Sequence, residues 1–139
     1  MEKSPFQFTN PILRALRMQL NEGFSVPPEG SLPAETHFSS HVELIPDTPS
    51  AIVNLTFRMG RTDNQFPFIL EAEMAAQFMW APETPPQTLE IWLSQNAPAL
   101  LLGYMRPIVA NTISATGFPP YNIPFMNFTA GHSNAKQPE

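Results

Sequence analysis

The sequence predicts an α+β domain in which one long helix lies across an antiparallel sheet. Apolar residues occupy every second position without a break from Phe66 to Trp80, which is the period of a strand with one buried face. An apolar helical stretch follows from Asn96 to about Thr116, where Gly117 can end it. The strands therefore come first and the helix last, and a chain of 139 residues is expected to form one core.

Two shorter strands are expected before the long one. Residues 36–45 and residues 51–58 each place apolar side chains at alternate positions, with Pro46 and Pro49 bounding a turn between them. The residues expected to face inward are Phe38, Val42, Leu44, Ala51, Val53, Leu55 and Phe57. Residues 12–20 fit either a helix or a strand, because their apolar positions suit both periods.

The helix carries its own signals at its start and in its middle. Asn96 is the expected N-cap, with Pro98 in the first turn. Pro107 lies inside the helix, where it removes a hydrogen bond and crowds a carbonyl, so a kink is expected. The predicted apolar stripe comprises Leu101, Tyr104, Met105, Ile108, Thr112 and Ile113.

Several classes of chemistry are disfavoured by the sequence. There is no cysteine, so thiolate metal sites and thiol nucleophiles are excluded. His37 and His41 lie four residues apart on a predicted strand, roughly 13 Å, which is too far for one metal ion. No phosphate-binding glycine loop or serine nucleophile motif is present. We therefore expect no cofactor, no metal and no enzymatic activity.

Charge and hydropathy argue against two kinds of partner. The net charge is −5 and the basic residues are scattered, which disfavours binding to nucleic acid. No apolar run reaches the roughly 18 residues of a membrane span, and the N-terminus has no apolar signal core. The expected location is the cytoplasm, without membrane insertion. The run from Ala97 to Phe128 carries more apolar surface than a helix and tail easily bury, which favours contact with other chains.

Motifs in the C-terminal half resemble those of the SecB protein-export chaperones. The helix carries a Pro-x-x-Leu-x-x-Tyr-x-Arg pattern, and Phe-Pro-x-x-Asn and then Asn-Phe follow it. The long strand carries an Ile-x-Glu element that resembles the family's Leu-x-Glu. The matching residues are Ile69, Glu71, Ala75, Ala76, Phe78, Pro98, Leu101, Tyr104, Arg106, Phe118, Pro119, Asn122, Asn127 and Phe128.

The resemblance implies a fold, an assembly and a function. The family fold is a four-stranded antiparallel sheet with helices on one side, and it would cover residues 1–128, with 129–139 as a flexible polar tail. Family members form homotetramers as dimers of dimers. They are ATP-independent holdases that bind unfolded preproteins in hydrophobic grooves and deliver them to the motor ATPase SecA.

Candidate site residues follow from the motifs and from the aromatic content. The side chains expected to line a client groove are Phe24, Val26, Phe78, Trp80, Tyr104, Phe118, Tyr121 and Phe125. The alternative for each is ordinary packing in the core or between subunits. Docking of SecA would involve Ile69, Glu71 and Glu73. The two glutamates are otherwise a solvated strand face.

Two departures from the family pattern keep a second function open. Ser25 follows Phe24 where family members usually carry an acidic residue, and the sequence after Phe128 is short and polar. Both features belong to regions that contribute to SecA docking in the family. A SecB-like chaperone or adaptor dedicated to one partner, such as an antitoxin, is therefore the alternative prediction.

Overall fold

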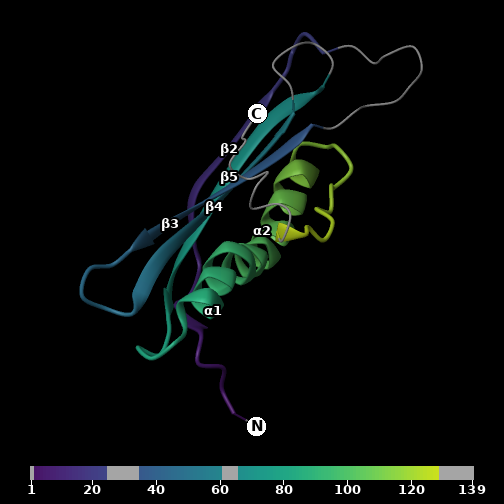
Figure 1. The fold of residues 1–139 in the computed structure, drawn as a ribbon. Helices are drawn as coiled ribbons and strands as arrows, with labels where there is room; N and C mark the ends of the chain where they lie inside the picture. Colours follow the sequence, from purple (N-terminus) through teal and green to yellow (C-terminus); the bar gives the residue numbers. More distant parts are fainter. Residues whose placement is uncertain (1, 25–34, 61–65, 129–139) are drawn as a thin grey trace.

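The computed structural model describes residues 2–24, 35–60 and 66–128, and in it an antiparallel sheet lies on one long helix (Figure 1). This arrangement confirms the predicted α+β class. The strands are β1 (Gln7–Phe8), β2 (Ile12–Leu20), β3 (Thr36–Leu44), β4 (Ser50–Gly60) and β5 (Phe68–Met79). The helical segments are α1 (Pro86–Ile91), a π-helical turn η1 (Trp92–Asn96) and α2 (Ala97–Ala115).

The five strands form a sheet that is four strands wide. The order is β1, β5, β4, β3, and β2 also pairs with β5. β1 pairs with the end of β5 at Met79 and Phe78, and β2 continues along β5 from Ala75 to Phe68. The structure thus has five strands where the resemblance implied four, because β1 and β2 share one edge of β5.

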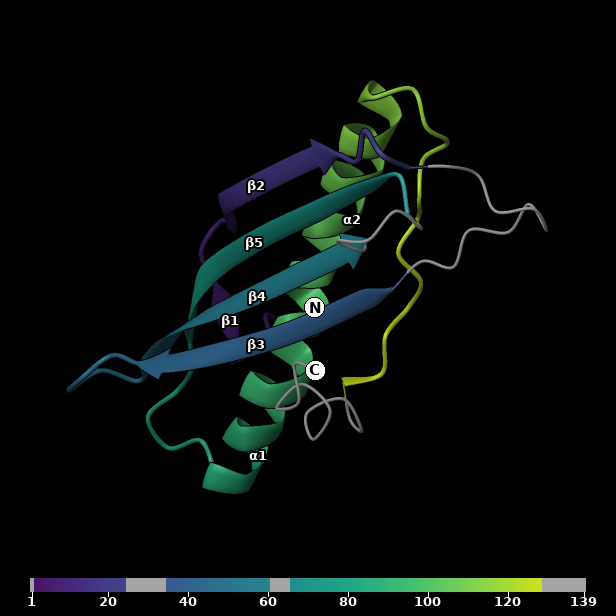
Figure 2. The same cartoon turned by 90° about the horizontal axis from the view of Figure 1, so that it is seen from above.

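The core lies between α2 and the inner face of the sheet. Figure 2 shows α2 crossing the strands. The alternation predicted for β4 and β5 is confirmed, because each predicted inward residue on these strands is buried. Buried residues of β4 and β5 on this face are Ala51, Val53, Leu55, Phe57, Met59, Phe68, Leu70, Ala72, Met74, Ala76 and Phe78. On β3, Phe38 and Val42 pack against this core, whereas Leu44 is exposed.

Residues 12–20, which fitted two periods, form strand β2. The register slips between Leu13 and Ala15, so Arg14 is a bulge residue. Leu16 pairs with Ala72 and therefore faces α2, whereas Ile12 pairs with Ala75 on the outer face. In a regular strand Ile12 and Leu16 would lie on the same face of the sheet, and the bulge places them on opposite faces.

The helical region begins earlier than predicted, and Asn96 is not its cap. Helix α1 starts at Pro86, and Asn96 has helical dihedral angles and makes no capping hydrogen bond. Pro98 therefore lies inside a continuous helical run, where its ring would crowd the carbonyl of Ser94. The wide turn η1, in which the Ala97 amide donates to the Trp92 carbonyl, lies directly before it.

Helix α2 buries a stripe that overlaps the predicted one only in part. Leu101, Met105 and Ile113 are buried as expected, but Tyr104 is exposed. Leu102 and Val109 are buried on the opposite flank of the stripe. Pro107 lies inside α2, which continues to Ala115. The buried stripe is therefore rotated around the helix, and Tyr104 lies at its margin.

Candidate functional site

Strand β2 presents an apolar row that α2 does not cover. Leu13, Leu16 and Leu20 pair with Met74, Ala72 and Phe68, so they lie on the helix side of the sheet. The helix packs mainly against β4 and β5, however, and leaves these leucines open. Leu16 is 41% exposed and Leu20 is 48% exposed.

The flank of α2 nearest the β1 and β2 edge is also apolar and open. Tyr104 is half exposed, and its ring packs edge-on against Phe8, with 6.3 Å between the centroids. Ile108 follows one turn later and is only partly buried. We call Leu13, Leu16, Leu20 and Tyr104 the open apolar face. It combines an unpartnered sheet margin with an aromatic side chain on the neighbouring helix.

The opposite flank of α2 is closed by the segment that follows the helix. This segment runs back beside α2 on the β3 side (Figure 2). Arg106 holds it, because its Nε donates to the Ile123 carbonyl at 2.7 Å and its Nη2 to the Pro124 carbonyl at 3.1 Å. Ile123 and Phe128 are buried, and Phe128 lies edge-on to Phe38. The apolar surface of α2 itself is therefore accessible on one flank and covered by the following segment on the other.

The predicted groove residues have different environments. Phe78 is 1% exposed and belongs to the core, so its assignment to a groove is wrong: its ring stacks on Phe6 and is inaccessible to a client. Trp80, Phe118 and Tyr121 are partly buried against the core. Phe24 is half buried, and Val26 lies outside the described residues.

Phe118 and Phe125 do not lie on the open apolar face. Phe118 packs against Phe68, where the centroids are 5.6 Å apart. Phe125 is 94% exposed and lies against the Arg106 guanidinium, 4.9 Å from its ring centroid, on the closed flank. Among the seven predicted residues that the structure describes, Tyr104 is the one that lies on the open apolar face. The other members of that face come from β2. Leu16 and Leu20 lie on the same side of this strand, because an even number of positions separates them.

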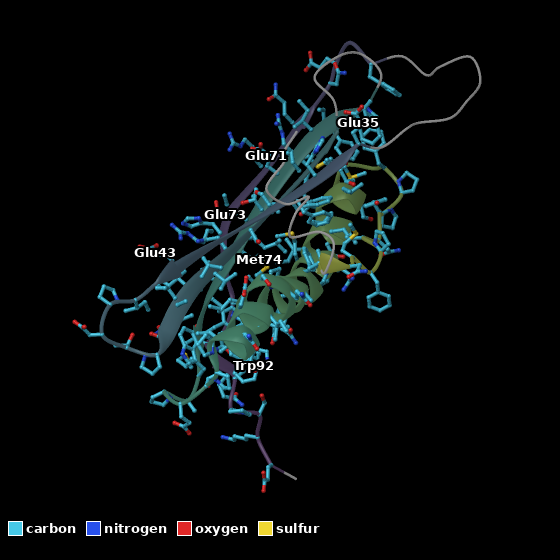
Figure 3. The ribbon with its side chains drawn as sticks, viewed as in Figure 1. Glu35, Glu43, Glu71, Glu73, Met74 and Trp92 are labelled. Carbon is cyan, nitrogen blue, oxygen red and sulfur yellow. The ribbon has the colours of Figure 1, made fainter. Side chains whose placement is uncertain are left out.

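The predicted docking residues lie on the outer face of the sheet: Figure 3 shows Glu71 and Glu73 away from α2, and the strand register places Ile69 on the same face. Glu71 is paired with two arginines: its Oε1 is 3.1 Å from Arg17 and its Oε2 is 3.1 Å from Arg58. Ile69 and Glu73 are partly exposed beside it. The two guanidinium groups neutralise Glu71, so this part of the sheet is not a simple acidic patch.

Other kinds of site receive no support from the described part of the chain. Within it, no three histidine, cysteine or acidic side chains gather closely enough to hold a metal ion. None of the helices described has the length and apolar content needed to cross a membrane. The candidate contact surface rests on the exposed side chains of the open apolar face.

Comparison with known proteins decides the family. The model of the family described as preprotein translocase subunit SecB matches residues 35–139. The chain belongs to the SecB family. The matched range extends from β3 to the end of the chain, and the match confirms the resemblance seen in the sequence motifs.

Individual relatives agree with the family model over shorter stretches. SecB of Nitrosomonas europaea is 32% identical over 85 residues, which are 61% of this chain and 52% of that protein. SecB of Xanthomonas campestris is 38% identical over 45 residues, which are 32% of this chain and 26% of that protein. The matched stretches thus span between a quarter and half of these relatives.

A solved structure shares the fold over most of the chain. A SecB-like chaperone from Mycobacterium tuberculosis, determined in complex with a peptide from an antitoxin, superposes with a TM-score of 0.71. The match covers 88% of this chain and 91% of that one, at 16% sequence identity. At this identity the likeness supports the SecB-like fold.

Proposed function

We propose that this SecB family protein is an ATP-independent holdase that binds unfolded preproteins on its open apolar face. The observation that carries the proposal is the row of exposed leucines on β2 beside the exposed ring of Tyr104. Exposed apolar groups gathered on one surface mark an interaction site, whereas scattered ones do not. Family membership makes an unfolded polypeptide the favoured occupant.

The chemistry of the face suits an extended chain. β2 pairs only with β5 among the described strands, so its other edge keeps free backbone donors and acceptors. An extended client could add its backbone to this edge while its apolar side chains pack on the leucines. Burying one such side chain contributes about 1.5–3 kcal/mol, so a few contacts give useful affinity without sequence specificity.

Holding a client in this way requires no bond making or breaking. We therefore propose that the protein is not an enzyme and that it uses neither nucleotide nor metal. We also propose that it is a homotetramer, the assembly that membership of the SecB family favours. Light scattering is expected to give about four times 15.5 kDa.

The test of the holdase proposal is suppression of aggregation. The purified protein, without nucleotide, is added to a chemically denatured model protein as the denaturant is diluted. Light scattering from aggregates is expected to fall to near zero at about one chaperone assembly per client. Unchanged aggregation at a several-fold excess would contradict the proposal.

A dedicated chaperone for one partner is the second candidate. The pairing of Glu71 with Arg17 and Arg58 favours it, because a neutralised carboxylate is a weaker contact for a basic docking segment. The structural relative, named as a chaperone in complex with an antitoxin peptide, shows that the fold occurs in that setting. Affinity purification separates the candidates: many preproteins together with SecA indicate export, and one stoichiometric partner indicates a dedicated role.

A further inference from the structure

The residues that precede β2 lie on the domain as a short extended chain with alternating apolar side chains. Phe6 and Phe8 are half buried, whereas the other residues of positions 2–10 are exposed. The backbone of β1 pairs with the end of β5 at Met79 and Phe78. We call residues 4–9 the β1 segment. It adds a two-residue strand to the edge of β5 and turns one side of that strand toward the domain.

The two phenylalanine rings fill an aromatic site between the end of β5 and the helices. The Phe6 ring stacks on Trp92 of η1, with the centroids 4.9 Å apart, and on Phe78, with the centroids 5.3 Å apart. The centroid of the Phe8 ring lies 6.0 Å from that of Phe78 and 6.3 Å from that of Tyr104. The chain's own segment therefore closes off Phe78, while Trp92 and Tyr104 stay partly open beside it.

The backbone ladder between the β1 segment and β5 is short and irregular. The Thr9 amide donates to the Gln77 carbonyl at 2.9 Å, as in a regular ladder. The Gln77 amide, however, donates to the Thr9 hydroxyl at 3.0 Å, where a regular ladder would use the Thr9 carbonyl. Asn10 and Pro11 then separate β1 from β2. The pairing of β2 with β5 therefore does not require β1.

The β1 segment has the features expected of a bound client. It is extended, it adds its backbone to a sheet edge, and it presents an apolar side chain at every second position. Two half-buried rings must offset the entropy that is lost when the segment is ordered. Segments with few buried apolar contacts open locally at low cost in free energy. A competing chain with the same features could therefore take its place.

We propose that Phe78, Trp92 and Tyr104 form a second client-binding site, which the β1 segment occupies until a client displaces it. The ligand is an extended segment with aromatic residues at alternate positions. Its backbone would pair with the edge of β5, and its rings would replace those of Phe6 and Phe8. The proposal rests on the holdase function proposed above and adds an autoinhibitory contact, which covers Phe78 while no client is present.

The binding test uses the full chain and a short fluorescent peptide in which two phenylalanines alternate with glutamine. A peptide of the same composition with adjacent phenylalanines is expected to bind about tenfold more weakly, because its rings point to opposite sides of an extended chain. Combining Phe6→Ser with Phe8→Ser is expected to strengthen binding of the alternating peptide about tenfold or more, since apparent affinity scales with the fraction of open sites. A purely structural role for the two rings predicts weaker or unchanged binding.

Displacement of the β1 segment can be observed directly, because the chain has no cysteine. Gln7 is exposed and lies on the side of β1 away from both rings, so Gln7→Cys can carry a nitroxide label. Saturation with the alternating peptide is expected to sharpen the electron paramagnetic resonance spectrum, because the label becomes mobile. Gln19→Cys is the matched control at an exposed position of β2, and its spectrum is expected to stay unchanged.

An unchanged spectrum at position 7 with saturating peptide would overturn the proposal, as would the absence of peptide binding. A double variant at positions 6 and 8 that is folded by circular dichroism but gains no affinity would also overturn it; if that variant does not fold, the label alone decides. Label release is expected to persist when Leu16→Ser and Leu20→Ser weaken the open apolar face, and its loss there would count against a separate site. Aggregation suppression by the parent protein is measured independently, so this proposal and the holdase proposal can fail separately.

Discussion

Replacing Leu16 and Leu20 together by serine is expected to abolish most of the suppression of client aggregation. Both side chains are exposed on the helix side of β2 and belong to the open apolar face. Each would lose about 1.5 kcal/mol or more of apolar burial against a client, which corresponds to about tenfold in affinity per residue. The chaperone concentration for half-suppression is the quantity to measure.

The control for this variant lies on the same strand. Ile12→Ser removes a more exposed apolar side chain from β2, but Ile12 faces the outer side of the sheet. It is expected to retain full suppression. All three residues are solvent-exposed, so both variants are expected to fold. Circular dichroism checks this expectation. Equal loss in the two variants would show that general apolar content, and not the open apolar face, determines the activity.

Gly60→Ala is expected to destabilise the fold by about 2–4 kcal/mol, which is large for a domain of this size. Gly60 ends β4 with a φ of 114°, a conformation that L-residues with a side chain rarely adopt. A Cβ atom there would lie 2.1 Å from the backbone carbonyl oxygen of Phe68. The pairing of β4 with the start of β5 would have to shift. Urea unfolding measures the loss in free energy.

Gly103→Ala is the matched control for this substitution. Gly103 lies inside α2, and a Cβ there would meet no atom within 4 Å. Alanine is expected to stabilise the protein by about 0.5–1 kcal/mol, because it lowers the entropy lost when the helix forms. A stability for Gly60→Ala that matches the parent protein would contradict the account of the β4–β5 junction.

The central sheet was predictable because its signals are local. The alternation in β4 and β5 follows from strand geometry, and one covered face requires apolar residues at every second position. The motifs around Tyr104 and Phe118 then indicated the family. Residues 12–20 remained ambiguous because their apolar positions suit both the helix period and the strand period. The bulge at Arg14 also breaks the regular two-residue alternation of a strand.

The start of the helix was predicted wrongly because a local start signal lies inside a longer helical run. Asn96 followed by Pro98 is typical of a helix start, but the helical run already extends from Pro86. The wide turn η1 precedes Pro98 without ending the run. Such a turn has no clear sequence signature.

The candidate binding residues were harder to predict, because aromatic content does not tell which side of a helix a residue will face. Phe78 is buried by Phe6, and Phe125 lies over Arg106 on the closed flank. Both positions depend on contacts between residues far apart in the sequence. The leucines of β2 became candidates only when the pairing with β5 showed which side they occupy.

Site-specific photocrosslinking of a bound client tests the central claim most directly. A photoreactive phenylalanine analogue is placed at Leu16 on the open apolar face, at Ile12 on the outer face, or at Phe125 on the closed flank. An unfolded, labelled client is then added without nucleotide. The account predicts strong crosslinking from position 16 and little from positions 12 and 125. Crosslinking mainly from position 125 or position 12, with none from position 16, would contradict it.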